Sequence, residues 1–328
     1  MDPWFVPAWS EPALWRLAAA LAGAWALDAV FGEPPNRWHP VAWLGTALQP
    51  LTRWLPTLLP VSGLLAGSLA WAVVVGAVVL VAAAVQALLL AAPAWCGVPL
   101  LALLLKPSLA WRMLHDEVAA VGQALASAPA GSAASLAAGR DRVARLCSRD
   151  VWALDADGVV ETAVETLAEN LNDSLVAPLW WCVLFGLPGA WAWRAVNTLD
   201  AMWGYRGRWD AAGKCAARAD DLLAWLPARL SALLLAPPSW RALWRQAGLT
   251  PSPNGGWPMA AMALHLGVRL RKPGVYTLNA GAPSPGLPQL RRALQHGRRA
   301  AWLAVGLALA TLAWLAWLAA TAGPGAGA

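Results

Sequence analysis

The run from Trp54 to Leu105 contains 52 consecutive residues without a single aspartate, glutamate, lysine or arginine. A helix that crosses a bilayer needs about 20 mainly apolar residues, so this run is long enough for one complete crossing and a shorter further piece. Across the whole chain 59% of the residues are hydrophobic and only 13% are charged, against about 25% charged residues in a soluble domain. We therefore predict an all-α, polytopic membrane protein. The composition excludes a disordered chain and disfavours a soluble enzyme.

Further apolar segments predict four or five membrane helices in a single membrane domain over 1–328, with re-entrant or interfacial helices and polar loops between them. The piece 98–105 is too short to cross alone, and we expect it to re-enter or to form the end of another helix. Two prolines and Gly186 interrupt the segment 175–193, which either crosses or re-enters. The segment 222–236 is apolar apart from Arg229, and this charge leaves open whether the segment crosses the membrane. The candidate spans are 14–31, 61–90, 175–193, 222–236 and 300–322.

Charged residues are concentrated in the polar segments between these spans. The stretch 269–299 holds seven lysines and arginines and no acid, which favours the cytoplasmic side of the membrane. Because the basic residues of the chain are dispersed around apolar segments, nucleic-acid binding is a poor explanation of the net charge of +6. No phosphate-binding P-loop, serine-hydrolase elbow or H-E-x-x-H motif occurs. The polar functional segments are 32–41, 106–173, 194–221 and 252–281.

Four acids follow one another at intervals of four residues on a predicted helix: Glu161, Glu165, Glu169 and Asp173. Like charges at this spacing lie on one helix face and destabilise the helix. The nearby sequence offers no cation, because no lysine or arginine lies between Asp150 and Arg194. A bound Mg²⁺ would relieve the repulsion, since Mg²⁺ prefers carboxylate oxygens together with substrate phosphates. The alternative is a solvated acidic face paired with arginines from elsewhere in the chain.

The stretch 194–229 mixes charges of both signs. Arg206, Lys214 and Arg218 are suited to hold phosphate oxygens, and the neighbouring acids are suited to hold a counter-metal. The alternative is a loop beside the membrane whose basic residues meet anionic headgroups. That alternative explains the adjacent acids Asp220 and Asp221 poorly.

His39 lies in the rigid, proline-rich segment GEPPNRWHPV, directly after the first apolar segment. A histidine beside an acid and an arginine can bind a ligand or transfer a proton. The competing interpretation is that His39 is a structural residue.

Five motifs in order resemble one family: GEPPNRWHPV, VETLAENLNDSLVAPL, RAVNTLDAMWGY, ARADDLLAWLPARL and SPNGGWPMAAMALHLGVRL. This series is similar to the adenosylcobinamide-phosphate synthases of cobalamin biosynthesis, over residues 27–281. The resemblance implies a multi-pass protein of the bacterial inner membrane. It also implies the activity, which joins adenosylcobyric acid to (R)-1-aminopropan-2-ol or its O-phosphate by an amide bond, with ATP and Mg²⁺.

The resemblance, together with the charge pattern, assigns roles to individual residues. His39 is the candidate base for the aminopropanol ammonium. The predicted catalytic residues are His39, Glu165, Glu169, Asp173 and Asp200. The predicted magnesium ligands are Glu165, Glu169, Asp173, Asp200, Asp220 and Asp221. Binding of substrate or phosphate is predicted for Asn170, Asn197, Arg206, Lys214, Arg218, Arg229 and Asn254. The sequence departs from the family pattern at Ser174, Arg194, Ala224 and Met259.

The expected partners are the corrinoid, the amino alcohol, the lipid bilayer and other enzymes of the same pathway. Polar residues beside interrupted helices also mark transport paths, so a membrane corrinoid carrier or transporter is an alternative. A non-catalytic scaffold for corrinoid enzymes is another. If the motifs around Asp173 and Asn197 serve one site, the segment between them is expected to be a re-entrant hairpin turning near Gly186, or else the two motifs share an intramembrane cavity.

Overall fold

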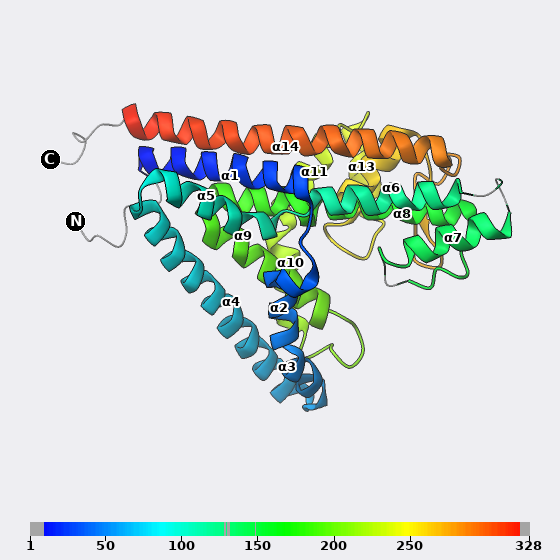
Figure 1. Ribbon diagram of the computed structural model, residues 1–328. Coiled ribbons are helices and arrows are strands. Elements are labelled where there is room, and N and C mark those ends of the chain that lie inside the picture. The colour runs from blue at the N-terminus through cyan, green and yellow to red at the C-terminus, as the bar shows by residue number, and fades with distance from the viewer. Residues whose placement is uncertain (1–9, 128, 130–131, 148, 322–328) are drawn as a thin grey trace. The chain divides into compact units, whose positions relative to one another are not determined.

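The computed structural model describes residues 10–127, 129, 132–147 and 149–321, and this part of the chain is almost entirely helical (Figure 1). Five of its helical stretches are long and apolar enough to cross a membrane. They are Glu11–Phe31, Pro60–Ala91, Ala94–Leu125, Ala156–Trp203 and Leu287–Thr321. The prediction of an all-α, polytopic membrane protein is confirmed.

The described residues divide into two compact units; a single membrane domain over 1–328 stays a prediction. Unit 1 is formed by the described residues of Met1–Ala110, Ala177–Leu223 and Val305–Ala328. Unit 2 is formed by those of Trp111–Val176 and Ala224–Ala304. Most of the polar segments 106–173 and 252–281 belong to unit 2.

Unit 1 is built on the pairs α4 with α9 and α1 with α5. Its long helices are α1 (Glu11–Phe31), α4 (Pro60–Ala91), α5 (Ala94–Leu105) and α9 (Ala177–Trp203). Its short elements are η2 (Asn36–Trp38), α2 (Pro40–Ala47), α3 (Gln49–Trp54), η3 (Leu55–Thr57), η4 (Lys106–Ser108) and α10 (Lys214–Leu223).

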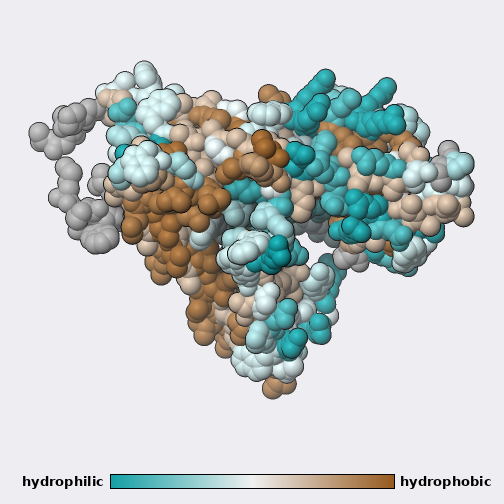
Figure 2. Space-filling model, in the orientation of Figure 1, coloured by the Kyte–Doolittle hydropathy of each residue, from teal (hydrophilic) through white to brown (hydrophobic). Residues whose placement is uncertain are grey.

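The outward surface of α4 is apolar along its length, and Figure 2 shows it as a brown band. Leu65, Leu69 and Leu80 on this helix are about two-thirds exposed or more. A contiguous exposed surface of this kind is unfavourable in water and suits contact with lipid. The surface therefore supports a membrane location for α4.

Unit 2 is centred on α8 (Ala156–Leu171), which packs against α6, α7, α13 and β1. A π-helical turn, η5 (Asn172–Val176), follows α8 directly. The other helices are α6 (Trp111–Leu125), α7 (Ala133–Val143), α11 (Trp225–Leu234), α12 (Trp240–Ala247) and α13 (Gly256–Leu266). The strands β1 (Leu270–Lys272) and β2 (Tyr276–Leu278) form an antiparallel hairpin in which Lys272 lies opposite Tyr276. The helix α14 (Leu287–Thr321) begins in unit 2 and ends in unit 1.

Most of the expected spans coincide with long helices, with two differences. The segment 222–236 is not one helix but the end of α10 followed by α11, each of 10 residues. Ten residues rise only about 15 Å, which is half the hydrocarbon core of a bilayer. The last helix begins earlier than the expected span 300–322, whose final residue, Ala322, lies outside the described residues.

The helix α9 is broken at Gly186, where the backbone has φ 68° and ψ −144°. Only glycine adopts this conformation without strain, and a Cβ at this position would collide with the Gln86 carboxamide. The Gln86 Oε1 accepts a hydrogen bond of 2.7 Å from the Leu187 N–H, which the break leaves without a helical partner. Gln86 is a buried polar residue of the otherwise apolar α4. The chain therefore bends where the sequence predicted an interruption; whether the segment re-enters the membrane stays a prediction.

Replacing Gln86 by leucine should destabilise the fold by about 1–3 kcal/mol, because the buried Leu187 N–H then has no acceptor. Thermal unfolding of the purified protein in detergent, followed by helical circular dichroism, measures the change. Gly76→Ala, a substitution in the same helix at a position with open space, is the control and should not lower the melting temperature. A Gln86→Leu variant as stable as the parent would contradict this account of the break.

Candidate functional site

The first two acids of the α8 row are buried and bound to arginines. Glu161 is completely buried, and its carboxylate accepts from Arg269, at 3.4 Å, and from Arg271, at 3.1 Å. Both arginines belong to the β1 region, more than 100 positions along the chain. An unpaired carboxylate could not be buried to this degree. Glu161 therefore fixes α8 to the hairpin.

Glu165 is held by a third arginine, Arg149, from the segment before α8. Arg149 Nη2 lies 2.8 Å from Glu165 Oε2, and Arg149 Nη1 donates to Thr162 Oγ1 at 3.1 Å. Burial would lower the pKa of Arg149, but Glu165 outweighs this effect and raises it. The repulsion between Glu161 and Glu165 is thus relieved by arginines from elsewhere in the chain. This pairing was the alternative to a metal ion, and the structure shows it for these two acids; a metal role for Glu165 stays a prediction.

Glu169, the third acid of the row, is not neutralised in this way. Within the described residues Glu169 makes no ion pair, and Lys272 and Arg149 are the cations that act on it electrostatically. Its Oε1 lies against the backbone of Gly255, where a Cβ would stand 2.7 Å away. The glycine that precedes α13 therefore makes room for this carboxylate.

Asp173 lies in the π-helical turn and is oriented by two polar residues. Asn172 Nδ2 donates to Asp173 Oδ1 at 2.8 Å, and Ser231 of α11 donates to Asn172 Oδ1 at 3.2 Å. Turns of this kind widen the helix by one residue and occur often at functional sites. Asp173 and Glu169 are therefore placed close enough to interact electrostatically.

Tyr276 lies beside these acids in the β-hairpin. Burial, and then the negative charges of Glu165 and Glu169, raise the pKa of Tyr276. The hydroxyl therefore stays protonated and acts as a hydrogen-bond donor, and it lies 3.6 Å from Met259 Sδ. Together Tyr276, Lys272 and the two acids form one polar group at the C-terminal end of α8.

The six predicted magnesium ligands do not form one group in the described part of the chain, and their role stays a prediction. Among the described residues no three histidine, cysteine, aspartate or glutamate side chains are close enough together to hold a metal ion. Proteins usually bind Mg²⁺ through only one or two carboxylates, with substrate phosphates and water as the other ligands. Glu169 and Asp173 fit this pattern. Glu165 differs from them, because Arg149 binds its Oε2, and its role as a metal ligand stays a prediction.

Two predicted substrate residues of unit 2 contact each other. The Arg229 guanidinium lies between the rings of Trp225 and Trp257, 4.5 and 4.6 Å from their centroids. It donates to Asn254 Oδ1 at 2.7 Å, and burial lowers its pKa. These contacts show Arg229 and Asn254 holding the loop before α13. Asn170 instead bonds the Thr166 carbonyl on its own helix.

The remaining predicted residues lie in unit 1, on α9, α10 and the loop between them. Asn197 Nδ2 donates to Asp220 Oδ1 at 3.2 Å. Burial raises the pKa of Asp221, although Arg218 partly offsets the effect. Asp200 lies against the backbone of Gly204. The cations of this group point to the exterior: Arg206, Lys214 and Arg218 are exposed. Because the α8 row belongs to unit 2, the expectation of a single site stays a prediction.

The motif histidine is part of a buried cluster in unit 1. His39 Nδ1 accepts from the Val41 N–H at 3.2 Å, at the start of α2, and its Nε2 lies 2.5 Å from Glu33 Oε2. A nitrogen that accepts a hydrogen bond carries no proton, so the Nε2 proton is donated to Glu33. Both ring nitrogens are occupied. This geometry favours the structural interpretation of His39 over the predicted role as a base.

Lys106 completes the cluster from the end of the uncharged run. Its ammonium lies 2.6 Å from Glu33 Oε1 and 3.5 Å from Asp28 Oδ1. Burial would raise the pKa of Glu33, but the hydrogen bonds from His39 and Lys106 outweigh it and hold that pKa below its usual value. The cluster therefore contains two carboxylates against one ammonium.

Sequence reasoning did not single out several residues that lie beside the predicted site residues and set the charge around them. They are Asp28, Lys106, Arg149, Arg269, Arg271, Lys272 and Tyr276. Asp28 and Lys106 had a signal, since each is a lone charge at the border of an apolar segment. The basic stretch that begins at Arg269 was noticed, but only as an indicator of membrane orientation. Nothing in the local sequence connected Arg149 with Glu165.

Comparison with known proteins finds one consistent set of relatives. A family model described as CobD/Cbib protein matches residues 21–321. The cobalamin biosynthesis protein CobD of Rhodobacter capsulatus is 38% identical over 320 residues, covering 91% of this chain and 99% of its own. A probable CobD of Pyrococcus abyssi is 40% identical over 262 residues, covering 78% and 83% of the two chains. The CobD of Dehalococcoides mccartyi is 35% identical over 279 residues, covering 80% and 86%. No solved structure matches.

Arg149 and Glu165 should show strong energetic coupling. Removing one partner of a buried ion pair costs about 3–5 kcal/mol, because the other charge stays buried without compensation. Arg149→Met alone should therefore be strongly destabilising, and Arg149→Met combined with Glu165→Gln should be less destabilised than the sum of the single variants. A double-mutant cycle from thermal or denaturant unfolding measures the coupling. Additive effects would show that the pair does not stabilise unit 2.

In Glu33→Gln the melting temperature should depend less on pH in the acid range than it does in the parent protein. Because the pKa of Glu33 is lowered from 4.5 in the folded protein, ionised Glu33 stabilises the fold above about pH 4.5, and this contribution disappears as the pH falls through the lowered value. The difference in melting temperature between parent and variant should be largest near neutral pH and should shrink in acid. Asp157→Asn, at an exposed acid, is the control. A difference that grows below about pH 4.5 would reverse the assigned sign.

Proposed function

Because the chain belongs to the CobD/Cbib protein family, we propose that it joins adenosylcobyric acid to (R)-1-aminopropan-2-ol or its O-phosphate through an amide bond, with ATP as the energy source. The names of its relatives place those proteins in cobalamin biosynthesis. The observation that carries the proposal is the pair Glu169 and Asp173, two carboxylates close enough to act on each other electrostatically, with the Lys272 ammonium acting on Glu169.

The reaction needs activation of the corrinoid carboxylate. A carboxylate does not acylate an amine at neutral pH, because its oxygen is a poor leaving group. Transfer of a phosphoryl group from ATP to the carboxylate would create a better one, and this step requires positive charge around the phosphates. Mg²⁺, when bound, supplies part of that charge.

In this proposal the C-terminal end of α8 is the phosphate site. Glu169 and Asp173 hold the metal ion, and Asn172 with Ser231 keeps Asp173 in position. The Lys272 ammonium lies near the same carboxylates and is suited to contact a phosphate oxygen. The Tyr276 hydroxyl, which stays protonated, donates a hydrogen bond within the same group.

The exposed cations of unit 1 have a separate role in the proposal. Arg206, Lys214 and Arg218 are on the surface and would contact phosphate or the amide side chains of the corrin ring, and the acids of α9 and α10 (Asp200, Asp220 and Asp221) hold α10 and its loop. We place the protein in the cell membrane of a bacterium, with the basic stretch 269–299 on the cytoplasmic side, where ATP is available.

A direct assay tests the ligase against its alternatives. The purified chain is incubated with adenosylcobyric acid, aminopropanol phosphate, ATP and Mg²⁺, and the amide is measured by mass spectrometry. Corrinoid binding or flux without product would favour the carrier, for which the break in α9 is the supporting feature. If the protein shows neither product formation nor corrinoid binding or flux, the non-catalytic scaffold is the remaining alternative. Repeating the assay with unphosphorylated aminopropanol shows which amine is used.

Glu169→Gln and Asp173→Asn should each lower the rate of amide formation by about 100-fold or more, because removing one preorganised electrostatic contact costs about that much. Raising the Mg²⁺ concentration should partly restore the rate. Asp157→Asn, the same chemical change on an exposed residue in the first turn of α8, is the matched control and should keep the parent rate. Full activity in folded Glu169→Gln protein would contradict the assignment of the phosphate site.

A further inference from the structure

One face of the helix α14 is exposed along its length, and the chemistry of this face changes once. Between positions 291 and 299 the exposed side chains are all polar: Arg291, Arg292, Gln295, Arg298 and Arg299. From position 302 onward they are all apolar, and the large ones are Trp302, Leu303, Leu307, Trp314, Trp317 and Leu318. Both sets recur at intervals of three and four residues, so they lie on one stripe of the helix. The change takes place within one turn, between Arg299 and Trp302.

The apolar part of this stripe has the length of a bilayer crossing. From Trp302 to Thr321 the helix contains 20 residues and no charge, and these residues rise about 30 Å. The hydrocarbon core of a typical bilayer is about 30 Å thick, and tryptophan is enriched at its two borders. Trp302, which is 56% exposed, therefore marks the border nearest the arginines. Arg298 and Arg299 lie about 5 Å farther out, at the level of the lipid headgroups.

The other two arginines of the stripe lie beyond the headgroups. Arg291 and Arg292 precede Arg298 and Arg299 by seven residues, which is about 10 Å along the helix axis. The headgroup layer is only about 5–8 Å thick on each side of the core. The two pairs are therefore the same residue type on the same exposed face, and they differ in their distance from the membrane.

The protein itself does not balance the charge of Arg298 and Arg299. Within the described residues neither of them forms an ion pair with an acidic side chain. In the sequence no aspartate or glutamate follows Asp221, so neighbours on α14 cannot supply one. Basic side chains directly outside a membrane helix attract anionic headgroups, and a guanidinium holds a phosphate through two parallel hydrogen bonds. The pair therefore has the charge and the depth that a lipid phosphate requires.

We propose that Arg298 and Arg299 form a binding site for an anionic phospholipid. The lipid phosphate contacts the two guanidinium groups, and the acyl chains lie along the apolar stripe that begins at Trp302 and Leu303. This site is separate from the acids of α8 and does not depend on the proposed amide-forming reaction. Its function is to hold the start of the membrane-crossing part of α14 at the headgroup level.

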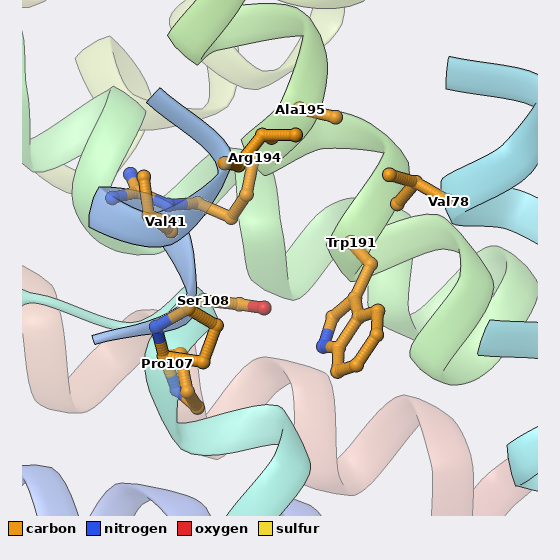
Figure 3. Close-up of a pocket in the computed structure, with 9 residues that line it drawn as sticks. Val41, Val78, Pro107, Ser108, Trp191, Arg194 and Ala195 are labelled. Atoms are coloured by element: carbon orange, nitrogen blue, oxygen red, sulfur yellow. The ribbon is translucent and has the colours of Figure 1, made fainter. Parts of the chain in front are cut away.

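A cavity of unit 1 is a second place where a lipid chain could be held, and it differs in selectivity. It has a volume of about 130 Å³ and lies between α2, α4, η4 and α9. Apart from Ser108 and Arg194 its lining is apolar, and Figure 3 shows the Arg194 side chain directed toward Val41 and not into the space. Such a lining selects apolar chains and not headgroup charge. A comparison of anionic and zwitterionic lipids with identical chains therefore measures the site on α14.

The test titrates the full-length protein in neutral detergent with phosphatidylglycerol or phosphatidylcholine of the same acyl chains, and native mass spectrometry gives the Kd. The parent should bind phosphatidylglycerol more tightly. Arg298→Gln combined with Arg299→Gln should weaken this binding by about 10- to 30-fold, since each basic residue at an anionic surface contributes about 5-fold. Binding of phosphatidylcholine should change much less. In 1 M salt, where charges are screened over about 3 Å, the preference of the parent should disappear.

Arg291→Gln combined with Arg292→Gln is the matched control, because it removes the same charge from the same stripe outside the headgroup layer. It should change the Kd for phosphatidylglycerol by less than about 3-fold, since charges farther apart than about 10 Å are largely screened. Both double variants should keep the melting temperature of the parent without lipid, because the four arginines are exposed and have no ion pair to lose.

Three results would overturn the proposal. Equal affinity of the parent for the two lipids would show that no anionic headgroup is selected. An equal loss of affinity in the two double variants would reduce the effect to net charge. A preference that persists in Arg298→Gln with Arg299→Gln, together with a lower rate of amide formation in lipid-free detergent, would assign these arginines to a substrate phosphate. Failure of the ligase assay with the lipid results as expected would contradict the proposed function and leave the lipid site intact.

Discussion

The compensation of carboxylates buried on α8 is the interaction on which unit 2 depends. Glu161 and Glu165 are almost fully removed from water, and such groups are tolerated only when a cation and hydrogen bonds replace the lost hydration. The cations come from two distant places, the segment before α8 and the β1 strand. Both must therefore reach α8 before it can be buried, which ties the hairpin and the preceding loop to the central helix.

The same row of acids changes character along its length. The two N-terminal acids are bound by arginines and act as structural anchors. The two C-terminal acids lie where the helix widens into a π-turn, with Asn172 and the backbone of Gly255 as their neighbours. An even spacing in the sequence thus becomes two pairs with different surroundings. The difference arises from tertiary contacts, which set the local charge balance, and not from the spacing itself.

Features that depend on local composition could be predicted from the sequence. Contacts between residues that are far apart in the chain could not. Helix class, the long α4 and the break at Gly186 follow from apolar length and from proline and glycine, all of which act locally. Whether the segment 222–236 crosses was left open, and the helix boundary at Ala224 could not be seen in its apolar length. His39 looked like a base because its motif is polar, but the bond from the Val41 N–H can be seen only in three dimensions. Pairing of the acid row with distant arginines was one of the two alternatives, but which arginines they are could not be predicted, because Arg269 and Arg271 lie more than 100 residues away.

The buried polar groups of the two units differ in how completely they are satisfied, and this contrast separates structure from function. The Gln86 carboxamide meets the one N–H that the broken helix exposes, and Lys106 lies between two carboxylates. Such groups complete the fold and leave nothing for a ligand. The Ser108 hydroxyl has no protein partner within the described residues, and Glu169 has no ion pair there. A buried polar group that is paired inside the protein stabilises the fold, whereas a carboxylate without an ion pair, such as Glu169, is the kind of group to which the proposed phosphate site is assigned.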